Sequence, residues 1–262
     1  MAPSTATACM TDASTPVSRP TATASSVHMR SACFHPAPRD VLIIGLSSGS
    51  WAQVIVNNPS VEKLTIVEIN PGYAQLIAER PEVRSLLSNP KVTIIADDGR
   101  RWLRRHPGRL FDAVVSNTTW NFRANATNLL STEFLELVGR HLNPGGIVFY
   151  NTTLSRRVEK TACVAFAHGA RFSNHMVASN APLRWDYVRW RKVLEAYTID
   201  GKSQFNPTDK ADHDLLDTLV HEYGLDSEMV EQCPILMART AGLPVVTDDN
   251  MGTEWRYYLG LE

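Results

Sequence analysis

The feature that most constrains the fold of this sequence is a series of short apolar runs beginning near residue 40. Each run has five or six residues, which is short for a helix and typical of a strand buried on both faces of a parallel sheet. The runs span 41–45, 64–68, 92–96, 111–116 and 147–151, and stretches of helical character lie between them over 51–57, 73–80, 100–106 and 131–142. This alternation predicts an α/β fold, with a doubly wound, mainly parallel sheet and helices on both faces.

The two ends of the chain differ from this regular middle. Ser, Thr, Ala and Pro dominate residues 1–38, where Asp12 is the only acidic residue. Such a composition buries too little apolar surface to offset the entropy of ordering, so we expect a disordered tail, with a transit peptide as the alternative. We expect residues 39–262 to form a single domain. After residue 151 the pattern of apolar residues is less regular. It predicts helices over 160–168 and 213–223 and strands over 172–178 and 235–239.

Composition argues against several classes of function. The net charge is −1, so no strong positive field is present to attract nucleic acid. No apolar run approaches the roughly 18 residues of a membrane span, and the eight histidines show no metal-binding spacing. The four cysteines form no CxxC pair, which favours free thiols and a cytoplasmic protein. We interpret the basic run over 100–109 as a solvated helix face.

Three motifs follow the first three predicted strands, at the edge where open α/β sheets bind ligands. The Gly45–Gly49 turn opens a helix, so its backbone can approach a ligand closely and its amide groups can bind a polar group. Glu68 ends the second strand, 23 residues after Gly45, near the spacing at which an acid accepts hydrogen bonds from ribose hydroxyls. Asp98 and Gly99 follow the third strand, where Asp98 also suits the N-cap of the next helix. Together the three motifs predict a nucleoside site.

The kind of nucleoside follows from two fingerprints that the sequence lacks. The first turn does not continue as G-x-G-x-x-G, and the chain contains no G-x-x-x-x-G-K-[ST] loop. These absences disfavour NAD, FAD and hydrolysis of ATP by a P-loop. A nucleoside without a pyrophosphate fits better, which indicates S-adenosylmethionine or a relative of it.

A family resemblance makes this prediction more specific. The segments that carry it are Val41–Gly49, Val61–Asn70, Asp97–Gly99, Phe111–Ser116 and Leu142–Gly146. They resemble the spermidine synthase (polyamine aminopropyltransferase) family, and Val246–Asn250 is similar to its divergent bacterial members that carry a membrane transporter domain. The resemblance implies a Rossmann-like sheet of the class I S-adenosylmethionine-dependent methyltransferase type. It also implies that Glu68 holds the ribose and Asp98 the adenine amine, with the first turn around the methionine part of decarboxylated S-adenosylmethionine.

The expected cofactor is therefore S-adenosylmethionine or its decarboxylated form, without a metal, and methylthioadenosine is the expected product of aminopropyl transfer. The residues expected to bind the cofactor are Gly45, Ser47, Ser48, Gly49, Glu68, Ile69, Asp98, Gly99 and Asn117.

The acceptor side departs from the family pattern. Members of the family usually carry acidic residues where this chain has Ser48, Asn117, Trp120 and Thr153. Carboxylates offset the cost of burying the ammonium groups of a diamine, and one of them accepts the proton of the attacking amine. We therefore name Asn117, Trp120 and Asp249 as candidate catalytic residues. The expected acceptor is a small molecule, such as an amine, that is less cationic than a diamine or otherwise unusual.

The sequence is compatible with three functions. The first is an aminopropyltransferase-like enzyme. The second is a methyltransferase, because Ser48 places no negative charge near the carboxylate of S-adenosylmethionine. The third is a nucleoside-binding domain that has lost its activity. Nucleic acid and membrane insertion are expected in none of them, and a homodimer is a possible assembly because this fold often pairs in the family.

Overall fold

The computed structural model describes residues 35, 37–117, 126–206, 208–222, 229–253, 256 and 261. The expected tail over 1–38 lies almost entirely outside these residues. Trp120 lies outside them as well. Among the described residues, no helix combines the length and the apolar character needed to cross a bilayer.

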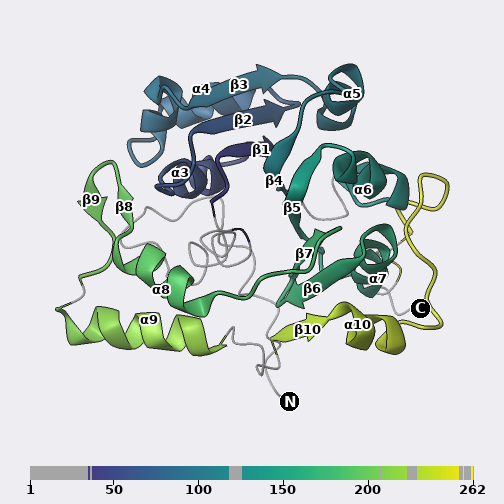
Figure 1. Ribbon diagram of the computed structural model, residues 1–262. Coiled ribbons are helices and arrows are strands. Elements are labelled where there is room, and N and C mark those ends of the chain that lie inside the picture. Colours follow the sequence, from purple (N-terminus) through teal and green to yellow (C-terminus); the bar gives the residue numbers. More distant parts are fainter. Residues whose placement is uncertain are drawn as a thin grey trace, which may run out of the picture.

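The centre of the structure is an eight-stranded sheet (Figure 1). Its first five strands in sequence pair in parallel and in the order β3-β2-β1-β4-β5. They are β1 (Asp40–Ile44), β2 (Lys63–Glu68), β3 (Val92–Ala96), β4 (Phe111–Ser116) and β5 (Leu142–Asn151). All five predicted strands are therefore confirmed, and the point where the order reverses, at β1 and β4, lies in the middle of the sheet.

Three further strands extend the sheet beyond β5. They are β7 (His175–Ser179), β6 (His168–Phe172) and β10 (Val230–Gln232). The strand β7 runs antiparallel to both β5 and β6, and β10 runs antiparallel to β6. The predicted strand over 172–178 is thus a hairpin of two strands. A separate two-stranded ribbon joins β8 (Thr198–Ile199) to β9 (Lys202–Ser203).

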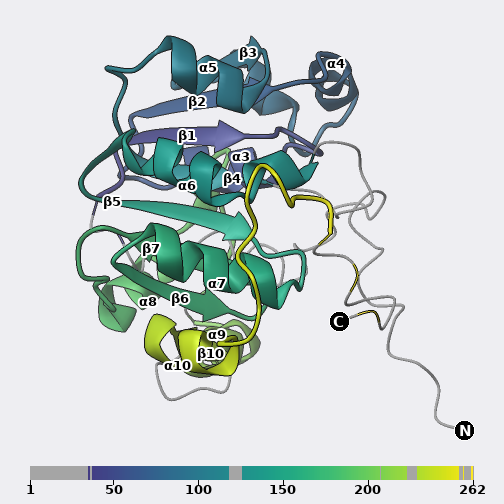
Figure 2. The same ribbon diagram turned by 90° about the vertical axis from the view of Figure 1, so that its right-hand side faces the viewer.

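Helices cover both faces of the sheet, as predicted (Figures 1 and 2). On one face lie α3 (Ser50–Val56), α4 (Gly72–Ala78), α8 (Tyr187–Glu195) and α9 (Lys210–Glu222), with the short 3-10 helix η3 (Arg84–Ser88). On the other lie α5 (Gly99–Arg105), α6 (Thr132–Gly139), α7 (Arg156–Ala165) and α10 (Cys233–Arg239). A second 3-10 helix, η4 (Ala126–Leu129), precedes α6.

The apolar runs fill two hydrophobic cores, one on each face of the sheet. In β1, Val41 and Ile43 pack into the core beneath α3, whereas Leu42 and Ile44 pack into the core beneath α5 and α6. Successive side chains point to opposite faces of a strand, so a strand covered on both faces needs an unbroken apolar run. Each such side chain contributes about 1.5–3 kcal/mol by its burial.

One predicted element has the wrong type. The segment 235–239 was expected to be a strand, but it belongs to the helix α10, and the strand β10 precedes it. Pro234 occupies the first turn of this helix, where a proline needs no amide hydrogen and already has a helical φ. A short apolar run does not by itself distinguish a strand from a buried helix, and the proline is the signal that decides here.

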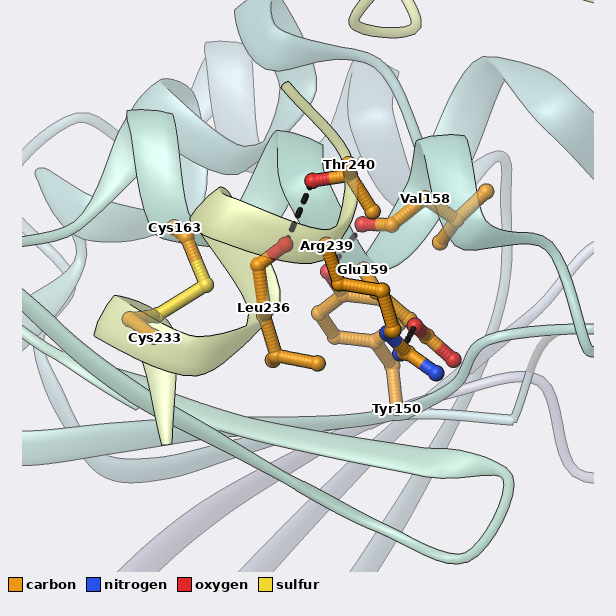
Figure 3. Close-up of a disulfide and its surroundings, with 8 residues drawn as sticks. All are labelled: Tyr150, Val158, Glu159, Cys163, Cys233, Leu236, Arg239 and Thr240. Atoms are coloured by element: carbon orange, nitrogen blue, oxygen red, sulfur yellow. Dashed lines mark hydrogen bonds and ion pairs between the residues drawn. A yellow bond between two sulfur atoms is a disulfide. The ribbon is translucent and has the colours of Figure 1, made fainter. Parts of the chain in front are cut away.

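The expectation of free thiols is also wrong for two of the four cysteines. Cys163 of α7 and Cys233, the first residue of α10, form a disulfide (Figure 3). They are separated by 70 residues, so no local spacing in the sequence predicts that they pair. Cys9 and Cys33 lie outside the described residues.

An ion pair beside the disulfide joins the same two helices. The carboxylate of Glu159 in α7 accepts a hydrogen bond from Arg239 at the end of α10 at 2.5 Å (Figure 3). Burial raises the pKa of Glu159, and the guanidinium groups of Arg239 and Arg171 act in the opposite direction. The covalent link and the ion pair together hold α10 against α7.

We predict that replacing both Cys163 and Cys233 by serine lowers the free energy of unfolding by about 2–4 kcal/mol. The loss is expected because the disulfide restricts the unfolded chain. Chemical denaturation of the oxidised wild type and the double variant measures it, with Cys33→Ser as the control variant. Equal stability of the two proteins, or free thiols at both positions in the denatured wild type, would contradict the disulfide.

Candidate functional site

The turn after β1 has a backbone that places its amide groups at the carboxyl edge of the sheet. Gly45 and Gly49 have positive φ angles of 93° and 80°, and Ser47 between them has a φ of 49°. A Cβ atom on Gly45 would lie 3.0 Å from the carbonyl oxygen of Asn117. The glycine therefore allows the turn to pass close to the end of β4, where Asn117 in turn donates its amide hydrogen to the carbonyl of Ile44.

Glu68 connects this turn to the end of β2. Its side chain is buried, with 5% of the residue exposed. One carboxylate oxygen accepts a hydrogen bond from the amide of Leu46 at 2.6 Å, and the other accepts one from the amide of Asn70 at 2.7 Å. The carboxylate therefore has a fixed orientation between two loops. Its burial also excludes an ordinary solvated carboxylate at the end of a strand.

A cavity of about 330 Å³ opens beside Glu68. It extends along β3 from Val92 to Ala96 and reaches the end of β2, between the turn after β1, the start of α4 and η3. Its lining is mostly apolar, with Glu68 and Asn70 as polar members, and it includes Leu46, Pro71, Ala74, Leu86, Leu87, Val92, Ile94 and Ala96. Ligand sites typically have about 300–1,000 Å³ and a mainly apolar lining with few polar groups, so this cavity has the character of a small-molecule site.

Asp98 and Gly99 come from the next strand and reach the same edge. One oxygen of the Asp98 carboxylate accepts a hydrogen bond from the amide of Arg101 at 2.7 Å, which confirms the predicted N-cap of the helix. Gly99 packs directly on the end of β1, because a Cβ atom added there would lie 2.4 Å from a methyl carbon of Ile44. The third motif is therefore held against the first.

Two further residues expected to bind the cofactor differ in their exposure. Ile69, directly after Glu68, is 70% exposed, which is unusual for an isoleucine and leaves an apolar surface at the edge of the sheet. Ser48 is half-buried, and its hydroxyl group hydrogen bonds with that of Ser50 at 3.0 Å. The structure thus gathers the predicted glycine turn, the acid of β2 and the motif after β3 at one edge.

The predicted acceptor side is only partly described. Asn117 is half-buried at the end of β4, and Thr153 is buried after β5 with a positive φ of 55°. Asp249 lies on the surface of the turn after residue 246, and its proposed catalytic role stays a prediction. The neighbouring acid, Asp248, has the more specific position, because its carboxylate contacts Arg100 at the start of α5.

Arg100 corrects the interpretation of the basic run as a solvated face. Its side chain is only 10% exposed and donates hydrogen bonds to both carboxylate oxygens of Asp248, at 2.7 and 2.5 Å. These hydrogen bonds lower the pKa of Asp248 below its usual value. In contrast, Arg101 and Arg105 are largely exposed, as predicted. The sequence contains a possible partner for this arginine, the acidic pair at 248–249. Only the fold shows that one of these acids pairs with Arg100.

Within the described part of the chain, no group of three or more His, Cys, Asp or Glu side chains is arranged to hold a metal ion.

The strand order and the helices on both faces of the sheet define an α/β protein with a Rossmann-like, methyltransferase-type fold. A family model described as the spermine/spermidine synthase domain matches residues 24–172, which is more than half of the chain. The chain therefore belongs to the spermine/spermidine synthase family.

Individual relatives match shorter segments. A spermidine synthase of Dictyostelium discoideum is 33% identical over 117 residues, which cover 44% of this chain and 40% of that protein. A polyamine aminopropyltransferase of Mycobacterium tuberculosis is 34% identical over 116 residues, covering 42% of this chain and 22% of that protein. The chain thus matches less than half the length of these curated relatives.

A solved structure supports the fold. The crystal structure of spermidine synthase from Thermotoga maritima aligns with a TM-score of 0.52 and 20% sequence identity, covering 76% of this chain and 68% of that one.

We predict that Gly99→Ala destabilises the protein by about 1–3 kcal/mol, because the new methyl group overlaps Ile44. Gly108→Ala is the matched control, since a Cβ atom there meets no atom within 4 Å. Denaturant unfolding of both variants measures the difference. If Gly99→Ala were as stable as Gly108→Ala, the close packing of the third motif on β1 would be wrong.

Proposed function

We propose that this protein is a spermidine synthase-like transferase that binds the nucleoside of decarboxylated S-adenosylmethionine and transfers its aminopropyl group. The observation that carries the proposal is the Glu68 carboxylate, which is buried, lines the cavity and accepts amide hydrogen bonds from two loops. A carboxylate has about four acceptor positions, so two remain for ribose hydroxyls. Because its orientation is already fixed, little ordering is needed when the ribose binds.

The remaining nucleoside contacts come from the same edge. One oxygen of Asp98 caps α5, and we propose that the other accepts a hydrogen bond from the adenine amine. The exposed side chain of Ile69 supplies an apolar surface for the base. The aminopropyl and sulfonium part of the cofactor is proposed to lie at the turn after β1, which contains Ser47, Ser48 and Gly49 and passes beside Asn117.

The chemistry of the acceptor side follows from the groups present there. In aminopropyl transfer, the nitrogen of a neutral amine attacks the carbon next to the sulfonium. A C–N bond forms as the C–S bond breaks, methylthioadenosine leaves, and the proton of the amine passes to a base. Asn117 and Trp120 are the residues proposed to face the acceptor. Asp249 is the candidate base, because it is an exposed carboxylate next to Asp248, which contacts Arg100 at the start of α5.

The acceptor is proposed to be less cationic than a diamine. An ammonium group that leaves water without a carboxylate partner loses several kcal/mol of hydration energy. The chain has Ser48, Asn117 and Thr153 at positions where acidic residues are usual in the family. Neutral hydrogen-bonding groups of this kind favour an acceptor with fewer charges.

Methyl transfer is the second candidate, and Ser48 is the observation that favours it. The Ser48 hydroxyl hydrogen bonds with Ser50 and carries no charge, so it does not repel the carboxylate of S-adenosylmethionine. A nucleoside-binding domain without activity is the third candidate, since several acidic positions of the family are replaced.

The assembly and location of the protein are further proposals. We propose a homodimer on the basis of the family fold, and a single domain over 39–262 preceded by a tail.

The expectation of a cytoplasmic location depended on free thiols. The disulfide between Cys163 and Cys233 removes that basis, because such bonds persist mainly in oxidising compartments.

We predict that methylthioadenosine and decarboxylated S-adenosylmethionine raise the melting temperature of the protein, because a ligand that binds only the folded state stabilises it. Differential scanning fluorimetry with these two compounds and S-adenosylmethionine measures the shift. A larger shift with S-adenosylmethionine supports methyl transfer, whereas binding without turnover on a panel of amines supports the inactive domain. The absence of a shift with all three compounds would reject the cofactor proposal.

We predict that Glu68→Gln weakens methylthioadenosine binding at least about tenfold, because hydrogen bonds to a charged group contribute about 1.5–3 kcal/mol. Isothermal titration calorimetry measures the affinity. Glu62→Gln is the control, since Glu62 precedes the same strand but pairs with Arg39 at the surface. An unchanged affinity in a folded Glu68→Gln variant would mean that the nucleoside binds elsewhere.

A further inference from the structure

We propose that Asp248 is a positioning residue, which fixes the cofactor-binding motif after β3 by holding the side chain of Arg100. This inference rests on the proposed nucleoside site. It adds a role for the C-terminal turn, which contributes none of the described lining of the cavity beside Glu68.

Asp248 forms hydrogen bonds with Arg100, Ser131 and Glu133, which belong to two other segments of the chain. Its two carboxylate oxygens accept hydrogen bonds from the two terminal nitrogens of Arg100. One of these oxygens also accepts a hydrogen bond from the hydroxyl of Ser131 at 2.6 Å. The amide of Asp248 donates to the carboxylate of Glu133 at 3.0 Å. The acid is therefore bound to the beginnings of both α5 and α6.

Arg100 links three segments near the carboxyl edge. They are the first turn of α5, the connection between β4 and α6, and the C-terminal turn that contains Asp248. Arg100 directly follows Asp98 and Gly99, so its backbone belongs to the first turn of α5. Its side chain also donates to the carbonyl oxygen of Asn128 at 3.2 Å, at the end of the connection between β4 and α6. Because a planar guanidinium binds a carboxylate through two parallel hydrogen bonds, Asp248 determines the direction of the Arg100 side chain and thereby connects all three segments.

The C-terminal segment that supplies Asp248 is itself firmly attached. From α10 it runs along α7 and α6 toward the carboxyl edge of the sheet (Figure 2). The ammonium group of Lys160 donates hydrogen bonds to the carbonyls of residues 240, 241 and 243. The amide of Val246 donates to Thr161, and the carbonyl of Val246 accepts from the amide of Thr132. These bonds, with the disulfide at the start of α10, determine where Asp248 lies.

The loss of the Asp248 carboxylate would therefore affect the site through Arg100. The guanidinium would stay buried with one strong partner fewer, and such a group reorients toward water or toward the adjacent loop. Asp98 and Gly99 would then lose a fixed neighbour. The reacting atoms would be untouched, so the nucleoside should bind more weakly while the chemical step is preserved.

The test compares Asp248→Asn with Asp217→Asn in the full chain. Asp217 also pairs with an arginine, Arg191, but it does so between α8 and α9, on the opposite face of the sheet. Calorimetry with methylthioadenosine, at a temperature where all variants are fully folded, gives the dissociation constant. We expect Asp248→Asn to raise it about tenfold and Asp217→Asn to leave it unchanged.

A double-mutant cycle separates positioning from a general loss of stability. Arg100→Met should weaken binding to a similar extent as Asp248→Asn, and the double variant should bind no more weakly than either single variant. Where turnover with an amine is measured, the KM for the nucleoside should rise in Asp248→Asn while kcat is retained.

The outcomes distinguish this inference from the proposed function. If the wild type does not bind methylthioadenosine, the nucleoside site itself is wrong. If the wild type binds it and Asp248→Asn binds equally well, the positioning role is wrong and the site stands. Additive losses in the double variant would also overturn the role, since they would mean that Asp248 acts independently of Arg100.

Discussion

The candidate site depends most on the hydrogen bonds that the Glu68 carboxylate accepts. Two amide groups, from Leu46 and Asn70, donate hydrogen bonds to it within a buried environment. Hydrogen bonds between a charged acceptor and amide donors are stronger than neutral ones and cost more to leave unsatisfied. The same acid therefore closes the turn after β1, fixes the loop after β2 and presents its remaining acceptor positions to the cavity. Glu68 thus has a structural role in the fold and, in the proposed function, a binding role as well.

A second set of contacts links the far end of the chain to this edge. The disulfide and the Glu159–Arg239 ion pair hold α10 against α7, and backbone hydrogen bonds continue the attachment as far as Val246. The turn that follows brings Asp248 to Arg100. In the proposed positioning role of Asp248, the last strand and helix of the described chain hold this turn in place and do not line the cavity.

The two halves of the proposed reaction differ in how far the chain keeps the family pattern. On the nucleoside side, the glycine turn, Glu68 and Asp98 are present and lie at one edge of the sheet. On the acceptor side, Ser48, Asn117 and Thr153 are uncharged, where the resemblance to the family leads us to expect acidic residues. The nucleoside side therefore keeps the groups that bind a ribose and a base, whereas the uncharged acceptor side favours an acceptor with few charges, because burying an unpaired ammonium group is costly.

Much of the fold and most of the candidate edge were determined by the sequence alone. A strand covered on both faces requires an unbroken apolar run, and the carboxyl ends of parallel strands meet at one edge. Five strands and the motifs at Gly45, Glu68 and Asp98 could therefore be placed from local patterns. The pairing of Cys163 with Cys233 and the contact between Asp248 and Arg100 could not. Each of these depends on which distant segments pack together, and only the tertiary structure decides that, because neither residue of such a pair carries a local signal of its partner.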